Sequence, residues 1–72
     1  MAVSNVQKKI MVFLEKQEWP VTTETVAVHL RVSWNTAQVH LLRLVTEGKV
    51  KYKRVGRQNQ FWLNRNYEKE MK

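Results

Sequence analysis

The spacing of apolar residues predicts a first helix at about residues 4–18. The apolar positions that repeat there at helical intervals are Val6, Ile10, Phe13 and Leu14. Ser4 is the expected N-cap. Trp19-Pro20 should end the helix, because proline pushes the residue before it out of the helical region. Val21 can form a strand of one or two residues.

A pair of helices at about residues 23–47 follows. Thr22 or Thr23 can cap a short second helix, whose apolar face is Val26, Ala27 and Leu30. Ser33 should cap a longer third helix, which Gly48 ends by entering the left-handed region. The core stripe predicted for this helix is Ala37, Leu41, Leu44 and Val45.

After Gly48 the apolar period falls from 3.6 to 2, which indicates a hairpin at about residues 49–63. Residues 49–55 read as a half-buried strand with lysines on the solvent side, 56–59 as a loop, and 61–63 as the return strand. The tail, residues 64–72, can add one or two helical turns in which Tyr67 and Met71 lie four apart.

This order of elements predicts one α+β, mainly α domain over residues 1–72, a winged helix-turn-helix of three helices plus a β-hairpin wing. The small Ala27 lets the second helix pack closely across the third. The first turn of the third helix is then free to enter a DNA major groove, which is about 12 Å wide.

The chain resembles the winged helix-turn-helix repressors of bacteria and archaea, including the ArsR-like and MarR-like groups. The matching residues are Ala27, Leu30, Val32-Ser33, Thr36, His40-Leu41, Leu44, Glu47-Gly48-Lys49-Val50, Gly56 and Phe61-Trp62-Leu63. The resemblance covers about residues 5–63 and implies a transcription regulator that binds double-stranded DNA.

The chain departs from this family at Arg31, where the turn between the second and third helices usually has glycine. A left-handed backbone there costs arginine about 1 kcal/mol relative to glycine. Either the turn differs slightly, or the arginine is retained for a phosphate. The chain also lacks cysteines and acidic-histidine clusters, so the metal-sensing branch of the ArsR-like group is not supported.

The amino-acid composition argues against most kinds of catalytic and metal-binding site. With no cysteine and two histidines in 72 residues, we expect no disulfide, no cysteine-zinc site, no bound metal and no cofactor. The sequence shows no carboxylate pair in an apolar setting, no nucleophile beside a base and no glycine-rich phosphate loop, so we do not expect an enzyme. We expect no membrane association and a cytoplasmic, nucleoid-associated protein, because the sequence has neither an apolar run of about 20 residues nor a signal-peptide pattern.

The net charge of +7 falls entirely within residues 31–65, where Glu47 is the one acid against eight lysines and arginines. A basic field of this kind favours a polyanion, and together with the predicted fold it indicates double-stranded DNA.

Candidate DNA contacts on the third helix are Ser33, Trp34, Asn35, Thr36 and Gln38. Asn and Gln side chains can bond adenine in two places, and Ser or Thr can bond bases or phosphates. Trp34 fits either a DNA contact or the core, because it also continues the core spacing.

In the wing the candidates are Lys53, Arg54, Arg57, Gln58 and Asn59, since an arginine at a hairpin tip can enter a narrow minor groove. Thr23, as a helix cap, and the cations Arg31 and Arg43 are candidate phosphate contacts.

The alternative function is a protein-interaction module within a larger complex. It rests on apolar residues left over once the core is filled, namely Val28, Val39, Leu42 and Trp62. These residues, the first helix or Tyr67 and Met71 can also mediate a homodimer. Left-handed or RNA duplex binding is less well supported, because the Asn/Tyr pair and the wing prolines of that branch are missing.

Overall fold

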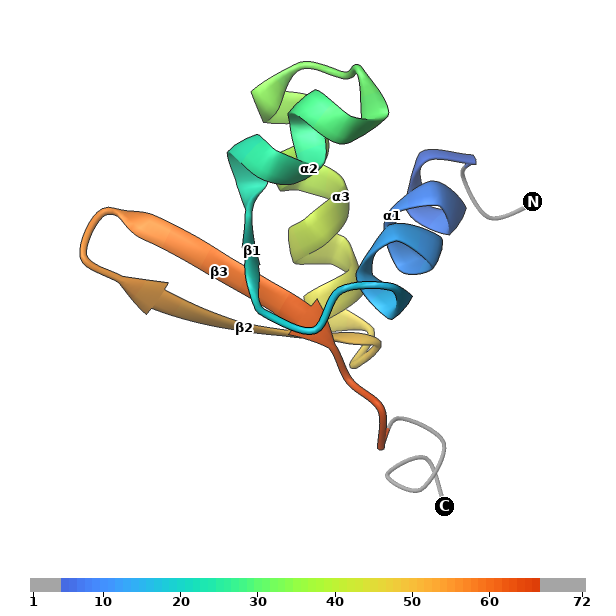
Figure 1. Ribbon diagram of the computed structural model, residues 1–72, viewed down its shortest axis with the longest axis vertical. Helices are drawn as coiled ribbons and strands as arrows, with labels where there is room; N and C mark the ends of the chain where they lie inside the picture. The colour runs from blue at the N-terminus through green and yellow to red at the C-terminus, as the bar shows by residue number, and fades with distance from the viewer. Residues whose placement is uncertain (1–4, 67–72) are drawn as a thin grey trace.

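Three helices and a three-stranded antiparallel sheet make up residues 5–66, the part of the chain that the computed structural model describes. The elements are α1 (Asn5–Glu15), β1 (Val21–Thr22), α2 (Thr23–Leu30), α3 (Trp34–Thr46), β2 (Val50–Val55) and β3 (Gln58–Leu63). The helices gather on one side, and the hairpin of β2 and β3 extends away from them (Figure 1). The predicted α+β winged helix-turn-helix is confirmed.

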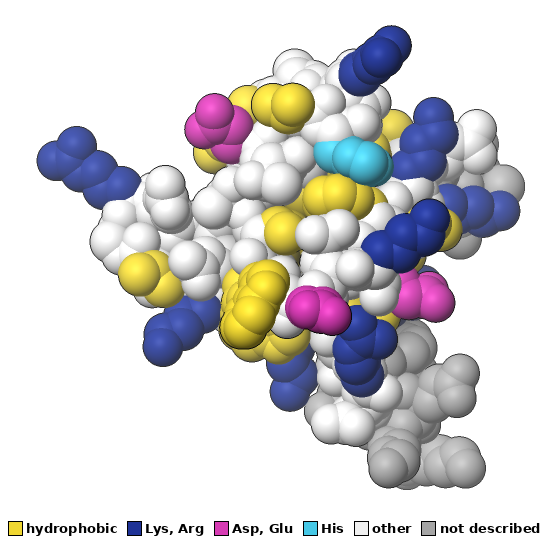
Figure 2. Space-filling view, viewed as in Figure 1, with side chains coloured by type: hydrophobic (Ala, Val, Ile, Leu, Met, Phe, Trp, Pro, Cys, Tyr) yellow, Lys and Arg dark blue, Asp and Glu magenta, His cyan; other side chains and the backbone are white. Residues whose placement is uncertain are grey.

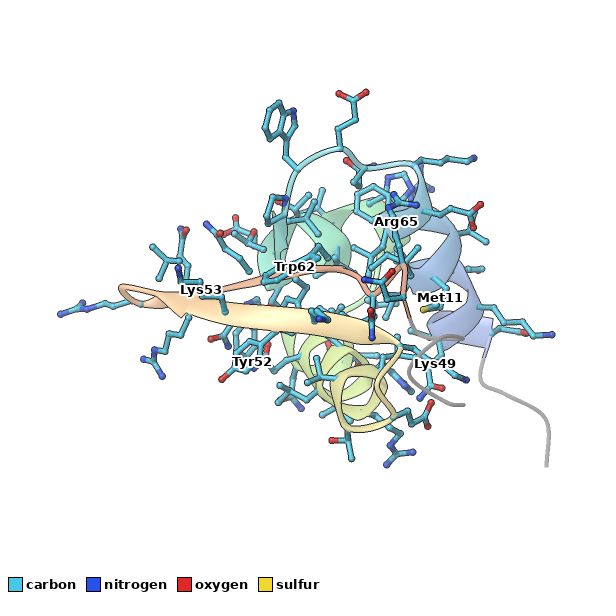
Figure 3. The ribbon with its side chains drawn as sticks, turned by 90° about the horizontal axis from the view of Figure 1, so that it is seen from below. Met11, Lys49, Tyr52, Lys53, Trp62 and Arg65 are labelled. Atoms are coloured by element: carbon cyan, nitrogen blue, oxygen red, sulfur yellow. The ribbon has the colours of Figure 1, made fainter. Side chains whose placement is uncertain are left out.

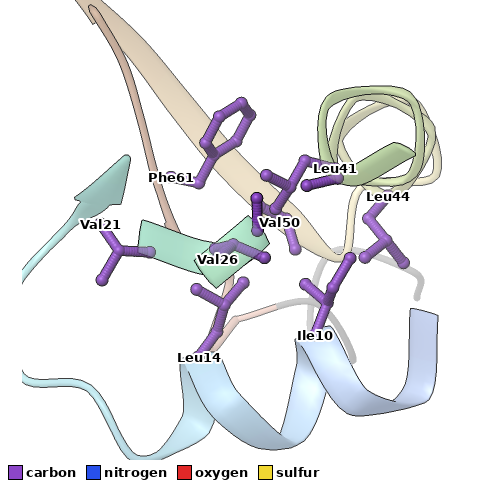
Figure 4. Packing of buried hydrophobic residues seen from close by; sticks show 10 residues of the cluster. Ile10, Leu14, Val21, Val26, Leu41, Leu44, Val50 and Phe61 are labelled. Carbon is purple, nitrogen blue, oxygen red and sulfur yellow. The ribbon is translucent and has the colours of Figure 1, made fainter. Parts of the chain in front are cut away.

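The core lies where the three helices meet the base of the sheet (Figure 4). Its buried apolar side chains are Ile10, Leu14, Val21, Val26, Ala27, Ala37, Leu41, Leu44, Val50 and Phe61. The helical stripes predicted for α1 and α3 therefore do face the core. Phe61 is fully buried, so the root of the wing belongs to the core while its tip does not.

The sheet has the strand order β1-β3-β2, with β3 in the centre. Val21 of β1 pairs with Phe61, and Val50 of β2 pairs with Leu63. The short strand expected at Val21 is confirmed. It ties the segment after α1 to the wing, and so fixes the wing against the helices.

The hairpin differs from its prediction in two ways. Its turn has two residues, Gly56 and Arg57, because Val55 already pairs with Gln58. Gly56 has a φ of +61°, and glycine with positive φ at the first turn position is typical of a type II′ hairpin. The predicted loop at 56–59 was thus too long, since Gln58 and Asn59 belong to β3.

Only the first residue of β2 is buried, so the prediction of a half-buried strand was also wrong. Tyr52 is 43% exposed and Val55 is 47% exposed. The alternation of apolar residues is real, but no helix lies under the outer half of the hairpin (Figure 1).

One helix end differs from its prediction, and at another the structure decides between the two caps that the sequence allowed. α1 ends at Glu15 rather than near residue 18, because Lys16 and Gln17 turn back to bond the carbonyls of Phe13 and Leu14 at 3.2 and 3.1 Å. Thr22 is the N-cap of α2, and its hydroxyl accepts from the Thr25 amide. The expected cap Ser4 and the expected helical turns at Tyr67 and Met71 lie outside the described residues.

The turn that joins α2 to α3 and the turn that follows α3 have the same backbone hydrogen bonds. Before α3, the amides of Arg31 and Val32 bond the carbonyls of Val28 and Ala27. After α3, the amides of Gly48 and Lys49 bond the carbonyls of Val45 and Leu44. Both patterns are Schellman motifs, which require a left-handed residue.

Gly48 has a φ of +85°, as predicted, and Arg31 has a φ of +59°. The turn is therefore the ordinary one with arginine in the position of glycine. Among residues 5–66, no helix has the length and hydrophobicity needed to cross a membrane.

Candidate nucleic-acid interface

The outward side of α3 lies opposite its core stripe of Ala37, Leu41 and Leu44. At 100° per residue, that side is occupied by Asn35, Val39, Leu42, Arg43 and Thr46. Asn35, Val39 and Arg43 follow one another at intervals of four, so they form a continuous line along the helix. This face offers an amide, an aliphatic side chain and a cation in sequence.

Two of the predicted contact residues bond each other at the start of α3. Ser33 is the N-cap, as predicted, and its Oγ accepts from the Thr36 amide at 3.1 Å. The same hydroxyl donates to Thr36 Oγ1 at 2.9 Å. These bonds fix the first turn of the helix, and they reduce what either hydroxyl can offer to a ligand.

A hydrogen bond between α2 and α3 changes the roles of two other candidates. Thr23 is buried, and its hydroxyl donates to Gln38 Oε1 at 2.6 Å. Thr23 is not the helix cap that was expected, and its hydroxyl faces α3 rather than solvent. Gln38 keeps its amide N–H groups as donors, which suits an acceptor such as a phosphate or a guanine edge better than the paired contact to adenine.

Trp34 is 54% exposed, which excludes the core position that its spacing also allowed. It stands in the first turn of α3 beside Asn35, which is exposed as well. The two side chains are open to a ligand that approaches this end of the helix.

The wing presents two different faces (Figure 3). Tyr52 lies on the side toward α3, where its ring stacks on Phe61 with centroids 5.5 Å apart. Arg54 and Asn59 are a cross-strand pair on the same side, two positions nearer the tip. This side therefore continues the outward face of α3.

Lys53 lies on the opposite face of the hairpin, together with Trp62 (Figure 3). Gln58, which alternates with Asn59 along β3, shares that face. The structure thus does not bring Lys53 and Gln58 together with α3. Trp62 also lies on the face of the hairpin away from α3, which carries Val39 and Leu42, so these three leftover apolar residues do not form a single patch.

Arg57 stands in the turn at the far end of the wing, where it is exposed. Figure 2 shows a basic side chain reaching out from this tip, at the left of the molecule. Arg54 is held closer, because its Nε donates to the Gly56 carbonyl at 3.2 Å. One arginine thus braces the turn while the other extends beyond it.

Arg31 belongs to another part of the surface. It lines a groove with Lys8, Lys9 and Lys16 of the α1 segment, and no wing residue lines that groove. The predicted phosphate contacts are therefore divided, with Arg43, Arg54 and Arg57 on the α3 and wing side and Arg31 on the α1 side.

Sequence reasoning missed Asn64, which holds the root of the wing. Its Nδ2 donates to the Gly48 carbonyl at 2.7 Å, its Oδ1 accepts from the Asn66 amide, and its own amide bonds the Lys49 carbonyl. Asn64 is 6% exposed. A single asparagine after a strand carries no periodic signal, so only the fold reveals its role. Residues 5–66 contain no group of three His, Asp or Glu side chains that could hold a metal ion.

Three solved structures share this architecture. A HOP2 structure, reported for its DNA recognition and protein interaction domains, matches with a TM-score of 0.77 at 23% identity, over 83% of this chain and 100% of that one. A MarR transcriptional regulator from Methanosarcina mazei Go1 matches with a TM-score of 0.78 at 22% identity, over 96% of this chain and 47% of that one. Disulfide-formed AbfR matches with a TM-score of 0.78 at 26% identity, over 96% of this chain and 49% of that one.

The chain spans about half the length of the MarR regulator and of AbfR. Comparison with proteins of curated function gives no match. The winged-helix part of the resemblance stated above is confirmed, and a MarR regulator is among the structural neighbours, but the family model that matches is not specific to the ArsR-like or MarR-like groups. The model for the FaeA-like protein matches residues 6–63, from the first turn of α1 to the last residue of β3. Because this match covers most of the sequence, the chain belongs to the FaeA-like protein family.

Proposed function

We propose that this chain binds double-stranded DNA and regulates transcription. In this proposal α3 enters the major groove, and the wing lies along the backbone or the minor groove. The observation that carries it is the continuous surface formed by the outward side of α3 and the adjoining side of the wing. Asn35, Val39 and Arg43 supply one part of that surface, and Arg54 and Arg57 supply the other.

The chemistry of this surface suits a duplex. Asparagine can bond adenine in two places, an aliphatic side chain can contact a thymine methyl group, and arginines can bind phosphates. From Gly48 to Asn66 the chain has six lysines and arginines and no acid, so the wing should attract a polyanion along its whole length. The HOP2 and MarR structures support the proposal, since they come from proteins described by DNA recognition and by transcriptional regulation.

Fluorescence anisotropy of a labelled mixed-sequence duplex, titrated with the chain at several salt concentrations, tests the proposal. Binding should weaken steeply with salt, with a log–log slope that corresponds to about four to eight neutralised phosphates. Arg57→Ala should lower that slope by about one unit for every sequence. Lys9→Ala removes the same charge from the α1 side and serves as the matched control, with an expected slope near that of the unmodified chain.

A site-selection experiment then separates base recognition from phosphate binding. Asn35→Ala should relax the selected sequence at one position, at a cost of about 1–3 kcal/mol for a two-point contact. Binding in the micromolar range or weaker, with almost no dependence on salt, would overturn DNA binding as the function. Equal losses for Arg57→Ala and Lys9→Ala would instead mean that α3 and the wing are not the contact surface.

A further inference from the structure

A groove of about 480 Å³ lies on the α1 side of the molecule, away from the wing. α1 supplies one wall, and the last turn of α2 together with the turn that follows it supplies the other. In Figure 1 α1 and the wing tip are at opposite ends of the molecule, so a duplex seated on α3 and the wing leaves this groove open.

The groove has an apolar floor. Val12, which is 53% exposed, lines the groove together with Phe13 and Leu30, which also pack against the core. The Phe13 ring stacks on the His29 ring with centroids 4.1 Å apart, which fixes the floor between α1 and α2. The exposed part of this floor offers apolar surface to a side chain of a partner.

The polar residues around the floor include four cations and no acid. Lys8 and Lys9 lie one helical turn before Val12 on α1, Lys16 lies in the turn directly after α1, and Arg31 lines the same groove from the turn after α2. Within residues 5–66, the one ion pair is between Lys49 and Glu47, so no carboxylate of that range neutralises these four cations. In Figure 2 basic side chains gather on the α1 side, across from the wing.

This concentration of positive charge is not visible in the sequence. Residues 1–30 contain three lysines and three glutamates and are neutral as a segment. Folding separates the positive side chains from the negative ones, because the lysines line the groove with Arg31 while Glu15, Glu18 and Glu24 do not. A basic rim around an apolar floor is therefore a product of the fold.

We propose that this groove is a docking site for an acidic segment of a partner protein that places apolar side chains over Val12 and Phe13. The carboxylates of such a segment match the four cations, and its apolar side chains cover the floor. A nucleic acid backbone would use the rim but would leave the apolar floor unfilled. A second copy of this chain is disfavoured by charge, because each copy carries +7. The proposal is independent of DNA binding by α3 and the wing.

Nuclear magnetic resonance titration of the full, nitrogen-15-labelled chain tests the proposal. The probe is a synthetic acidic peptide with leucines at helical spacing, and the matched peptide has serine at every leucine. We expect the leucine peptide to shift the amides of residues 8–16 and 29–31, and the serine peptide to bind about tenfold more weakly because the floor stays uncovered.

Three variants complete the test. Lys9→Glu with Lys16→Glu should weaken binding of the leucine peptide by about tenfold or more. Lys53→Glu with Arg57→Glu makes the same change of charge on the wing and should leave that binding nearly unchanged. Val12→Ser, at an exposed position where folding should be preserved, should weaken binding roughly fivefold.

Three outcomes would overturn the proposal. Equal affinity for the two peptides would show a surface that attracts any polyanion. Shifts confined to α3 and the wing would place the peptide elsewhere. Duplex DNA that shifts the groove amides, with its affinity reduced equally by the two charge-reversal variants, would make the groove a nucleic-acid surface.

Discussion

Arg31 closes α2 with a backbone conformation that suits glycine. Its φ of +59° costs an L-residue about 1 kcal/mol, whereas glycine adopts it freely. The Arg31 side chain lines the α1 groove. The backbone strain therefore falls at a residue whose side chain adds a positive charge to that groove.

Arg31→Gly should therefore raise the free energy of unfolding by about 0.5–1 kcal/mol. Urea denaturation measures the change, and Gly48→Ala is the control at the matching turn, with an expected loss of about 1 kcal/mol. The same Arg31→Gly variant should bind the acidic leucine peptide less tightly. A loss of stability in Arg31→Gly would mean that the side chain stabilises the fold by more than the turn strains it.

Val39 leads to a second prediction at this scale, which rests on the proposed DNA binding. It is 46% exposed in the middle of the outward face of α3, four residues after Asn35. At this place its methyl groups can contact the 5-methyl group of thymine. A selected duplex in which uracil replaces thymine should bind roughly three- to fivefold more weakly, since one buried methyl group is worth about 0.8 kcal/mol.

Val39→Ala should bind the two duplexes nearly equally, which makes a double-mutant cycle of protein and DNA. Anisotropy measures all four affinities. Equal binding of the thymine and uracil duplexes by the unmodified chain would contradict the methyl contact, but it would not contradict DNA binding itself.

At the scale of single residues, the sequence predicted the caps at Ser33 and Gly48, because capping depends on the residue itself and its nearest neighbours. It could not predict that Thr23 would be buried against Gln38, since that bond joins residues of two helices whose packing is set by the core. The lysines around Val12 were missed for the same reason, because their convergence with Arg31 requires the folded arrangement of α1 and α2.

Among the elements, the wing departs most from its prediction. Its alternating pattern was recognised, but alternation cannot tell how far a strand extends beyond the core. The two-residue turn moved Gln58 and Asn59 into β3, and the pairing then placed Asn59 beside Arg54 and Lys53 on the other face. Register thus determined which wing residues continue the face of α3.

Asn64→Ala should show how the wing depends on its root. The change removes the side-chain donor to the Gly48 carbonyl and leaves a part-buried acceptor unpaired, which should cost about 1–3 kcal/mol of stability. Hydrogen exchange should accelerate at the amides of Lys51 and Trp62, the hydrogen-bonded pair next to the bond between Asn64 and Lys49, before it does in the core of α3.

Asn66→Ala is the matched control, because the exposed Asn66 bonds Asn64 through its backbone amide, which the substitution retains. Its stability should stay within about 0.5 kcal/mol of the unmodified chain. Exchange at Lys51 and Trp62 that is unchanged in Asn64→Ala would mean that strand pairing alone holds the wing.

For the whole molecule, charge is the dominant property. The net charge is +7, and within residues 5–66 the one ion pair joins Glu47 and Lys49 at 3.4 Å. Like charges that are not compensated repel each other in the folded state, and salt screens that repulsion.

The melting temperature should therefore rise as sodium chloride increases from about 20 to about 200 mM, a range over which the Debye length falls from roughly 20 to 7 Å. Calorimetry or circular dichroism measures it. Lys53→Glu with Arg57→Glu, which lowers the net charge, should show a smaller rise. A melting temperature that falls with added salt would show that attractive pairs outweigh the repulsion.

The strand order also has a consequence for how the molecule is made. β3 lies between β1 and β2 in the sheet, although it is synthesised after both of them. At a synthesis rate of about 5–20 residues per second, about two to eight seconds pass between the synthesis of β1 and that of β3, its partner in the sheet. During that interval Val21 and Val50 lack Phe61 and Leu63, their partners in the sheet. Folding of the nascent chain should therefore be completed late and in one step, when Leu63 becomes free to close the sheet.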